Sequence, residues 1–515
     1  MSAALQRTGG RFPPSTYHPL SVGSGMRAVA RHSPDKVALI EGGRTRTFAQ
    51  FVAQADRVSA LVQGLGLRFG EACAILAPNC LEYIEVVVGA SSVGVAVATP
   101  NPRLTAHEIA AICEDCGARL LFVHASLAEM VRDSRFSGIE QVLVFGTSYD
   151  AAMADAGTPV LPPLQEWDAF SIPYTSGTTG RPKGVVLPHR SRLMGFFGMA
   201  SEYGCYGPAD SYLAIAPLCH GAGLCFAMAC IYFGGTCEIL PAFDPGEVVD
   251  KLSRVTCTFM VPTHFHAILG MEKSVVDRIR DHRLKTIISN AAPLPQKTKE
   301  VIVDVWGEGI LHETYGSTEG GIVTNLRPEF QLVKQKCVGK PFPCTQVRIV
   351  DEDNREVGPG EIGELFSISP YLFNGYWGRP EETAAALRDG WFSAGDLAMR
   401  DDEGFIYIVD RKKDMIISGG VNVYPREIEE VLFRHPQVLD AAVIGIPDEK
   451  WGETIVAVVV RRPGADADPE ALIAHCKAQL AGFKLPRRVV FSDALPRNPG
   501  GKVLKRELRA TVNLD

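Results

Sequence analysis

Hydrophobic and polar positions alternate along the first 400 residues as a succession of short strands and longer helices. Short apolar runs that end near turns predict buried strands at residues 71–78, 95–99, 120–123 and 284–288. Apolar residues at helical spacing predict helices at residues 81–93, 105–115 and 296–306. Thr105 is placed to cap the second of these helices. The alternation predicts an α/β fold of parallel sheets covered by helices.

The last hundred residues follow a different pattern. Residues 400–404 form a charged turn between two strands, and Pro425 stands where the first turn of a helix accepts proline. The elements expected in this part are strands at 405–409, 441–446 and 454–460 and a final helix from Asp468 to Leu480. We therefore predict two domains, a large N-terminal domain at 1–410 and a small, mobile α+β domain at 411–515.

Composition narrows the class of protein. A chain of 515 residues is too long for one core, and a net charge of −7 without a basic block gives nucleic-acid binding no support. Thirteen cysteines without regular spacing predict free thiols in a reducing compartment, and we interpret the Cys113–Cys116 pair as helix residues rather than metal ligands. Residues 1–15 lack the apolar core of a signal peptide, and no uninterrupted apolar run reaches ~18 residues. We expect a cytoplasmic protein.

One short segment combines glycines, hydroxyl groups and a lysine. Residues 174–183 read Tyr-Thr-Ser-Gly-Thr-Thr-Gly-Arg-Pro-Lys. Glycines let backbone N–H groups surround an anion, although the Gly-Lys-Ser/Thr spacing of a Walker A loop is missing. A flexible linker is the alternative, but a linker needs neither the lysine nor the apolar run that follows. We predict a phosphate-binding loop formed by Thr175, Ser176, Gly177, Thr178, Thr179, Gly180 and Lys183.

This loop resembles the phosphate loop of the adenylate-forming (ANL) superfamily, which includes acyl-CoA synthetases, aryl-CoA ligases, luciferases and adenylation domains of peptide synthetases. Four further segments agree in the family's order, and they are residues 315–319 (Tyr-Gly-Ser-Thr-Glu), 391–396, 410–414 and 496–502. The resemblance spans residues 38–508. It implies that ATP activates a carboxylic acid as an acyl-adenylate and that coenzyme A then takes the acyl group, with AMP and pyrophosphate released. The implied cofactors are ATP, Mg²⁺ and coenzyme A.

The resemblance also assigns roles at the nucleotide. Lys502 would stabilise the charge that builds up when a carboxylate meets the α-phosphate, although a solvated surface lysine is the alternative. Thr318 and Glu319 would act at the phosphates, where Glu319 would hold Mg²⁺. The remaining nucleotide contacts would be made by Ala291, Ala292, Tyr315 on adenine, Asp396 on the ribose and Arg411 on ribose or phosphate.

The acyl group is expected beside His220, which in an apolar stretch could otherwise be purely structural. Other residues predicted to contact it are Gly221, Ala222, Phe226, Phe265, Asn290, Gly316 and Ser317. The segments that carry these residues contain no arginine or lysine for a second carboxylate. We therefore predict an aromatic or medium-chain monocarboxylic acid, with a longer-chain fatty acid as the alternative.

In the C-terminal part the resemblance implies a hinge at Lys413 and contacts with coenzyme A. Ser418, Gly419 and Gly420 would line the path of the pantetheine arm. Trp451 and Phe483 match aromatic residues that hold the nucleotide of coenzyme A in some aryl-CoA ligases, whereas the alternative is a place in the domain core.

Other functions share these motifs. A stand-alone adenylation enzyme that loads a carrier protein, an oxygen-dependent luciferase-type monooxygenase and a non-catalytic binding protein all remain as alternatives. The context of Lys502 also predicts a lysine acetyltransferase and a deacetylase as partners, and a homodimer is a further prediction.

Overall fold

The computed structural model describes residues 19–132, 134–176, 182–418, 421–448, 450–497 and 503–512, and within these ranges the strands form four sheets. In spatial order the first sheet contains β15 (Lys340–Pro341), β14 (Gly321–Leu326), β13 (Leu311–Ser317), β12 (Thr286–Ser289), β11 (Cys257–Met260), β9 (Ser211–Ala214), β10 (Thr236–Ile239), β1 (Val37–Glu41) and β2 (Arg44–Thr47). Its central strands, from β13 to β1, are parallel, and the strands at both edges are antiparallel.

The second sheet has the same plan. It contains β18 (Gly375–Tyr376), β8 (Pro182–Pro188), β7 (Ala169–Ser176), β4 (Ala96–Thr99), β3 (Ala72–Leu76), β5 (Leu120–Val123) and β6 (Gln141–Val144). The strands from β7 to β6 are parallel, whereas β8 and β18 are antiparallel to their neighbours. Both sheets confirm the α/β class and the parallel pairing that the sequence predicts.

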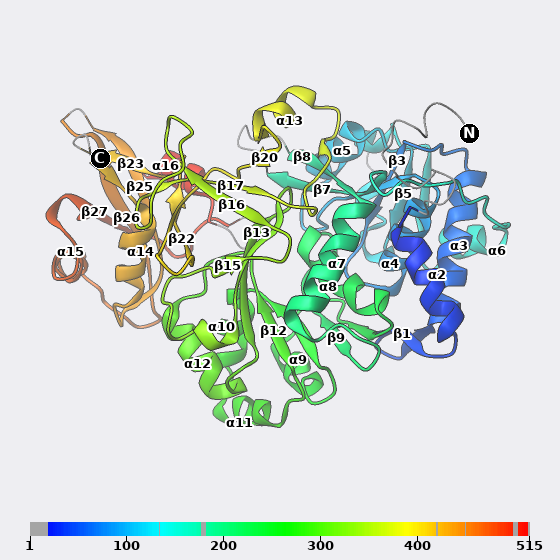
Figure 1. Cartoon of the computed structure of the whole chain (residues 1–515), viewed down its shortest axis with the longest axis horizontal. Helices are drawn as coiled ribbons and strands as arrows, with labels where there is room; N and C mark the ends of the chain where they lie inside the picture. Colours follow the sequence, from blue (N-terminus) through cyan, green and yellow to red (C-terminus); the bar gives the residue numbers. More distant parts are fainter. Residues whose placement is uncertain are drawn as a thin grey trace, which may run out of the picture.

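Helices connect and cover these sheets (Figure 1). They are α2 (Val22–His32), α3 (Phe48–Gly64), α4 (Leu81–Ser92), α5 (Ala106–Asp115), α6 (Ser148–Ala154), α7 (His189–Tyr203), α8 (Gly221–Tyr232), α9 (Pro245–Lys251), α10 (Pro262–Leu269), α11 (Lys273–Asp277), α12 (Gln296–Trp306) and α13 (Pro380–Ala386). Thr105 caps α5 through a reciprocal capping box with Glu108, as the sequence indicates.

Two helices explain how the two large sheets pack together. All but one of the residues of α4 are buried, and α8 is apolar around most of its circumference. Both helices contribute to one hydrophobic core that also contains residues of β1 and β10 from the first sheet and β3 and β4 from the second. A helix that is hydrophobic on all sides must be covered on all sides. The α4–α8 layer therefore lies between the sheets, while α9, α10 and α12 cover the outer face of the first and α5 that of the second.

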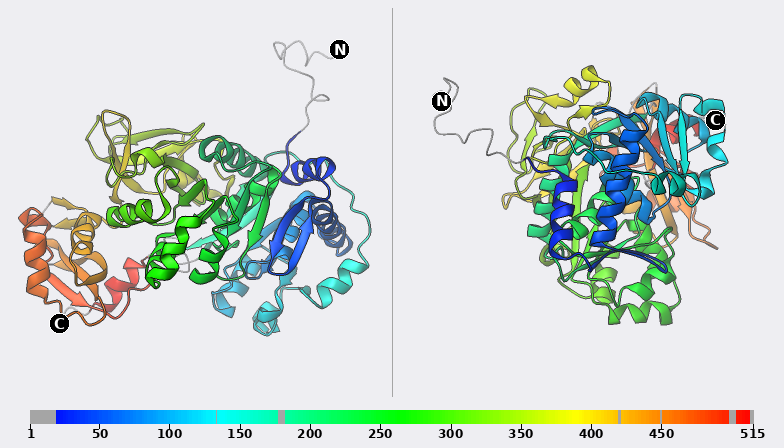
Figure 2. Two further views of the ribbon diagram at one scale, coloured as in Figure 1. Left: turned by 90° about the horizontal axis from the view of Figure 1, so that it is seen from below. Right: turned by 90° about the vertical axis from the view of Figure 1, so that its right-hand side faces the viewer.

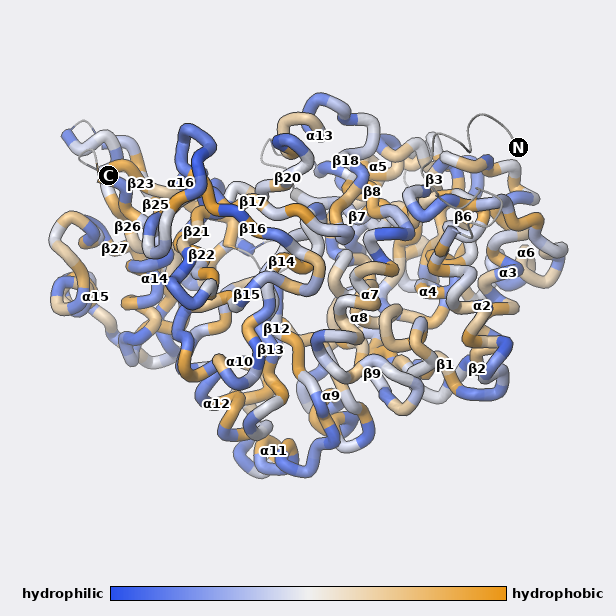
Figure 3. Tube along the Cα trace, in the orientation of Figure 1, coloured by the Kyte–Doolittle hydropathy of each residue, from blue (hydrophilic) through white to orange (hydrophobic). Residues whose placement is uncertain are grey.

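A third, antiparallel sheet follows. It contains β19 (Leu387–Arg388), β20 (Trp391–Phe392), β17 (Gly363–Ile368), β21 (Asp396–Arg400) and β22 (Ile406–Arg411), with β16 (Gln346–Val350) beside β17. Figure 3 shows the hydrophilic loop that joins β16 to β17 and extends from this sheet.

The fourth sheet forms a compact unit at one end of the molecule, opposite α2 and α3 (Figure 2). It contains β24 (Val421–Val423), β23 (Ile416–Ser418), β26 (Gly452–Arg461), β25 (Val438–Asp448) and β27 (Arg488–Phe491). Its helices are α14 (Pro425–Phe433), α15 (Pro469–Lys477) and α16 (Lys505–Thr511). α15 ends at Lys477, three residues before the predicted end at Leu480. Ala478, which follows Lys477, forms the C-terminal cap.

The cysteines are mostly internal. Of the thirteen, all within the described residues, Cys344 is exposed and Cys225 is half-buried, and the others are buried. Cys113 lies in α5 and Cys116 follows as its C-terminal cap, and burial raises the pKa of both thiols to about 12. Across the described ranges no helix has both the length and the apolar character needed to cross a bilayer.

Candidate active site

The predicted site residues of the N-terminal part follow the carboxyl ends of parallel strands. His220 follows β9, Asn290 follows β12, and Tyr315 to Ser317 form the end of β13. Asn101, which was not predicted, follows β4 of the second sheet. Carboxyl ends of parallel strands share one edge of a sheet, and ligands of α/β proteins bind outside that edge. Because α4 and α8 fix the two sheets against each other, residues far apart in sequence meet there.

One cluster joins three residues predicted to bind the adenosine. The Tyr315 hydroxyl donates to Asp396 Oδ2 over 2.5 Å, and Arg411 Nε lies 3.0 Å from Asp396 Oδ1. Asp396 and Arg411 are direct partners across β21 and β22, which explains why the ion pair forms. Burial raises the pKa of Tyr315 far above its usual range, and the carboxylate of Asp396 raises it further. Asp396 itself is 4% exposed, so a ligand hydroxyl would meet a nearly dry carboxylate.

The loop after β12 adopts an unusual backbone. Ala291 has φ of 76°, in the region that favours glycine. Asn290 anchors the loop, because its amide nitrogen donates to Thr314 Oγ1 over 2.8 Å while its oxygen accepts the N–H of Ala291. Further on, the N–H of Leu294 donates to Glu313 Oε1 over 3.2 Å. These hydrogen bonds and the neighbouring strand β13 therefore hold Ala291 in a backbone conformation that is unfavourable for alanine.

Substitutions at Ala291 should reveal this strain. We expect Ala291→Val to lower the free energy of unfolding by about 1–2 kcal/mol and to raise KM for ATP, because a β-branched residue tolerates positive φ poorly. Ala291→Gly, the matched control, should leave both quantities near those of the unaltered protein, since relief of strain is offset by chain entropy. Urea unfolding and ATP titrations measure the two effects. Equal behaviour of the two variants would contradict this explanation.

A second cluster lies at the predicted phosphate end. Thr175 and Lys183 pair across β7 and β8, on either side of the loop, and Lys183 Nζ lies 5.0 Å from the centre of the Tyr376 ring. The Tyr376 hydroxyl in turn donates to Glu319 Oε1 over 3.0 Å. Tyr376 was not predicted from the sequence. Gly177, Thr178, Thr179 and Gly180 lie outside the described residues, and of Ser176 only the backbone, at the end of β7, is described.

His220 stands immediately before α8 and contacts Asn101, whose Nδ2 lies 3.3 Å from His220 Nε2. Burial lowers the pKa of His220, and the positive charge of Arg103 lowers it further. His220 is therefore neutral at neutral pH. A Cβ placed on the neighbouring Gly221 would lie 3.5 Å from Thr318 Cγ2. The beginning of α8 therefore faces the residue that follows β13.

Arg192 on α7 was missed by the sequence analysis. The residue is 6% exposed, and its Nη1 donates to the carbonyl oxygen of Gly221 over 3.2 Å. Nothing in the local sequence of α7 distinguishes the buried Arg192 from the exposed Arg190 two residues before it. The structure thus adds a cation beside Gly221.

Two predicted acyl contacts prove to be core residues in this structure. Phe226 is 2% exposed and packs on Phe259, with ring centroids 4.8 Å apart. Phe265 is fully buried and packs edge-on against Trp306 of α12. Both side chains pack in the core in this structure, so their contact with the acyl group stays a prediction. Gly316 and Ser317 remain at the end of β13, where a Cβ on Gly316 would lie 2.0 Å from the Gly321 carbonyl oxygen, which only glycine permits.

The C-terminal residues are only partly described. Lys413 is exposed in the turn between β22 and β23, while Gly419, Gly420 and Lys502 lie outside the described residues. Ser418 is buried and pairs with Gly452. The Trp451 ring lies 4.0 Å from the guanidinium of Arg487, and Phe483 is 46% exposed. Within the described ranges, no hydrogen bond, ion pair or ring contact joins Trp451 or Phe483 to the strand-end clusters.

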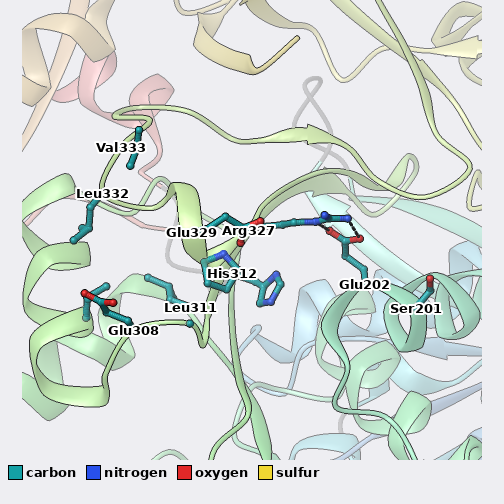
Figure 4. Close-up of a pocket in the computed structure, with 12 residues that line it drawn as sticks. Ser201, Glu202, Glu308, Leu311, His312, Arg327, Glu329, Leu332 and Val333 are labelled. Atoms are coloured by element: carbon teal, nitrogen blue, oxygen red, sulfur yellow. Dashed lines mark hydrogen bonds and ion pairs between the residues drawn. The ribbon is translucent and has the colours of Figure 1, made fainter. Parts of the chain in front are cut away.

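A groove of about 800 Å³ lies elsewhere, near the amino end of β13 (Figure 4). It is lined by Ser201, Glu202, Val303, Glu308, Gly309, Leu311, His312, Arg327, Pro328, Glu329, Leu332 and Val333. Arg327 holds Glu202 in a two-point ion pair, and burial lowers the pKa of His312 to about 4. None of the predicted site residues lines this groove, which is therefore not the candidate active site.

The α/β fold brings the predicted nucleotide-binding residues to the ends of its strands, and comparisons with known proteins identify the family. The AMP-binding enzyme family matches residues 26–377, and the AMP-binding enzyme C-terminal domain matches residues 427–502. The chain belongs to the AMP-binding enzyme family.

Three similar proteins illustrate the relationship. A 2-succinylbenzoate–CoA ligase of Geobacillus kaustophilus is 34% identical, over 93% of this chain and 96% of the relative. A feruloyl-CoA synthase of an Amycolatopsis species is 37% identical, with the same two coverages. The crystal structure of ATP-bound MatB from Rhodopseudomonas palustris superimposes with a TM-score of 0.88 at 30% identity, over 96% of this chain and 99% of that one. The protein is an AMP-forming acyl-CoA ligase.

Proposed function

We propose that this acyl-CoA ligase activates an aromatic or medium-chain carboxylic acid, with the reacting carboxylate at His220 and Thr318. The observation that carries the proposed site is the meeting of Tyr315, Asp396 and Arg411 at the strand edge that also holds His220. The sequence favours a monocarboxylic acid, because the predicted acyl segments contain no arginine or lysine. Arg192 supplies a cation beside Gly221, so the proposed acid is not limited to one carboxylate. A longer fatty acid is the alternative.

The nucleotide would lie along β13 between the two clusters. Asp396 accepts hydrogen bonds from the ribose, Ala291 and Ala292 flank the adenine with Tyr315, and Lys183 with the preceding loop holds the phosphates. Glu319 fits Mg²⁺, which binds one or two carboxylates together with phosphate oxygens. Its Oε1 accepts the hydrogen bond from Tyr376, and its Oε2 has no hydrogen-bond or ion-pair partner among the described residues. The ion would offset negative charge on the phosphates.

The domain division belongs to the same proposal. The proposed boundary between residues 410 and 411 lies close to Lys413, which is exposed in the turn between β22 and β23. Ion pairs lie on both sides of it, from Lys412 to Glu364 over 2.9 Å and from Arg509 to Asp414 over 3.4 Å. A swing at Lys413 would exchange these contacts and bring Ser418, Trp451 and Phe483 to coenzyme A for the second half-reaction.

Pyrophosphate release tests the proposal directly. The acids are benzoate, a hydroxycinnamate, 2-succinylbenzoate, hexanoate and a long-chain fatty acid, each with and without coenzyme A. We expect the aromatic and medium-chain acids to give the highest kcat/KM and a thioester product. Activity confined to long chains would support the fatty-acid alternative. Thioester formation only on an added carrier protein would support the carrier-loading alternative.

Ala222 offers a test of the acyl site. It is half-buried on the first turn of α8, next to Gly221. We expect Ala222→Phe to lower kcat/KM for large acids far more than for small ones, because extra bulk costs about 1–3 kcal/mol in a packed site. KM for ATP should not change, and Ala222→Gly serves as the control. A uniform fall across the acids would mean that this turn does not contact the acyl group.

Acetylation of Lys502 by a lysine acetyltransferase, reversed by a deacetylase, remains a proposal, as does a homodimer. Acetylation removes the positive charge that the first half-reaction would need. An acetylated preparation that keeps full pyrophosphate release would rule out this form of control.

A further inference from the structure

The buried side chain of Arg192 lacks a counter-ion among the described residues. Arg192 is almost fully buried, yet its one hydrogen bond among the described residues goes to a neutral group, the carbonyl oxygen of Gly221. Its Nε is buried without a partner. Burial of a charge without a counter-ion is costly, and native proteins pair or hydrogen-bond such groups. No described carboxylate forms an ion pair with Arg192, whereas the neighbouring Arg190 pairs with Glu166 over 2.8 Å.

The surroundings of Arg192 point toward the acyl site. On α8, Gly221, Ala222 and Cys225 are half-buried, whereas the residues from Phe226 to Tyr232 are buried. The partly accessible residues lie on the first turn and a half, next to His220. Arg192 therefore reaches the section of α8 that is not sealed by the core.

Within that section, Arg192 faces the second turn of α8, because the carbonyl oxygen of Gly221 that it contacts points along the helix toward Cys225. Burial raises the pKa of the Cys225 thiol, and the charge of Arg192 opposes that shift. Cys225 is four residues beyond Gly221, about 6 Å along the helix axis. The cation therefore serves the distal part of the acyl group rather than the carboxylate at His220.

We propose that Arg192 binds a second carboxylate on the acyl substrate, so that the preferred acids are dicarboxylic. This rests on the proposed placement of the acyl group at Gly221 and Ala222. A guanidinium matches a carboxylate in charge and geometry, and the pair is strongest where water is excluded. Bound substrate then supplies the counter-ion that the protein lacks. The acid must be long enough to span from His220 to Arg192.

Matched acid pairs test this inference. kcat/KM is measured with ATP and coenzyme A for adipate against hexanoate and for isophthalate against benzoate. The unaltered enzyme should prefer the dicarboxylic member of at least one pair by roughly 10-fold or more, as a charge-assisted hydrogen bond provides. Arg192→Met, of similar length without the charge, should lose that preference and retain activity on the monocarboxylic member. Arg192→Lys should retain part of it, and Arg190→Met is the surface control.

Three outcomes would overturn the inference. One is a preference of the unaltered enzyme for the monocarboxylic member of both pairs. Another is an equal fall in kcat/KM for both acids of a pair in Arg192→Met, which would mean that Arg192 only positions Gly221. If no acid yields pyrophosphate, the proposed function fails. The inference about Arg192 is then tested by the melting temperature of the protein with adipate or isophthalate. A rise in the unaltered protein that is absent in Arg192→Met supports the inference, and no rise overturns it. Arg192→Gln replaces the methionine variant if that protein does not fold.

Discussion

Replacing Lys299 with methionine is expected to lower the free energy of unfolding by about 3–5 kcal/mol. Lys299 on α12 is 1% exposed and forms an ion pair with Glu313 of β13, which is 5% exposed. Removing the ammonium leaves a carboxylate charged and buried, which costs more than the pair contributes. KM for ATP should rise too, because Glu313 also holds the N–H of Leu294 in the adenine loop. Urea unfolding and ATP titration measure the two effects.

Two further variants separate the causes. Lys297→Met removes an exposed lysine from the same helix and should change neither quantity. The double variant Lys299→Met/Glu313→Leu should regain much of the stability, because an apolar pair replaces the ion pair without leaving a charge. Its KM for ATP should stay raised, since leucine cannot accept the Leu294 hydrogen bond. A double variant as unstable as Lys299→Met would show that packing, not charge, controls this site.

Lys502→Ala should reduce acyl-adenylate formation by ~10²-fold or more while sparing thioester formation from a preformed adenylate. The reason is that a positioned cation stabilises the charge that develops as the carboxylate attacks the α-phosphate, and only the first half-reaction contains that step. Lys502 lies outside the described residues, so this expectation rests on the motif at residues 496–502. Pyrophosphate release and thioester formation are measured separately.

The control for this variant is Lys477→Ala, which removes an exposed lysine from the end of α15. Both half-reactions should remain normal in it. A parallel loss of both half-reactions in Lys502→Ala would contradict the assignment and would indicate a role in domain placement instead.

Local patterns were enough to predict much of the fold. The limits of α12 match the predicted helix at residues 296–306, and the Thr105 cap of α5 follows from four consecutive residues. Strands such as β5 were recognised because a buried strand in a parallel sheet is a continuous apolar run. The meeting of Tyr315, Asp396 and Arg411 was predicted only through the resemblance to a known family, since 81 residues separate Tyr315 from Asp396.

The contacts that the sequence could not predict join distant elements. Tyr376 reaches Glu319 from 57 residues away, and Arg192 reaches Gly221 from 29 residues away. Periodicity shows that a residue is buried, but not which partner it meets. The same limit explains Phe226, because an apolar residue on a helix covered on all sides can face either a ligand or the core.

The distribution of thiols makes the protein accessible to site-selective labelling. Among the thirteen cysteines, all described, Cys344 alone is exposed, and it lies between β15 and β16. Burial raises the pKa of most of the others, which removes the thiolate that reacts with maleimides. A dye added to the folded protein should therefore attach at Cys344 without prior removal of the native cysteines. A second cysteine introduced at exposed Lys477 would then allow distance changes between the large sheets and the C-terminal unit to be followed by fluorescence during turnover.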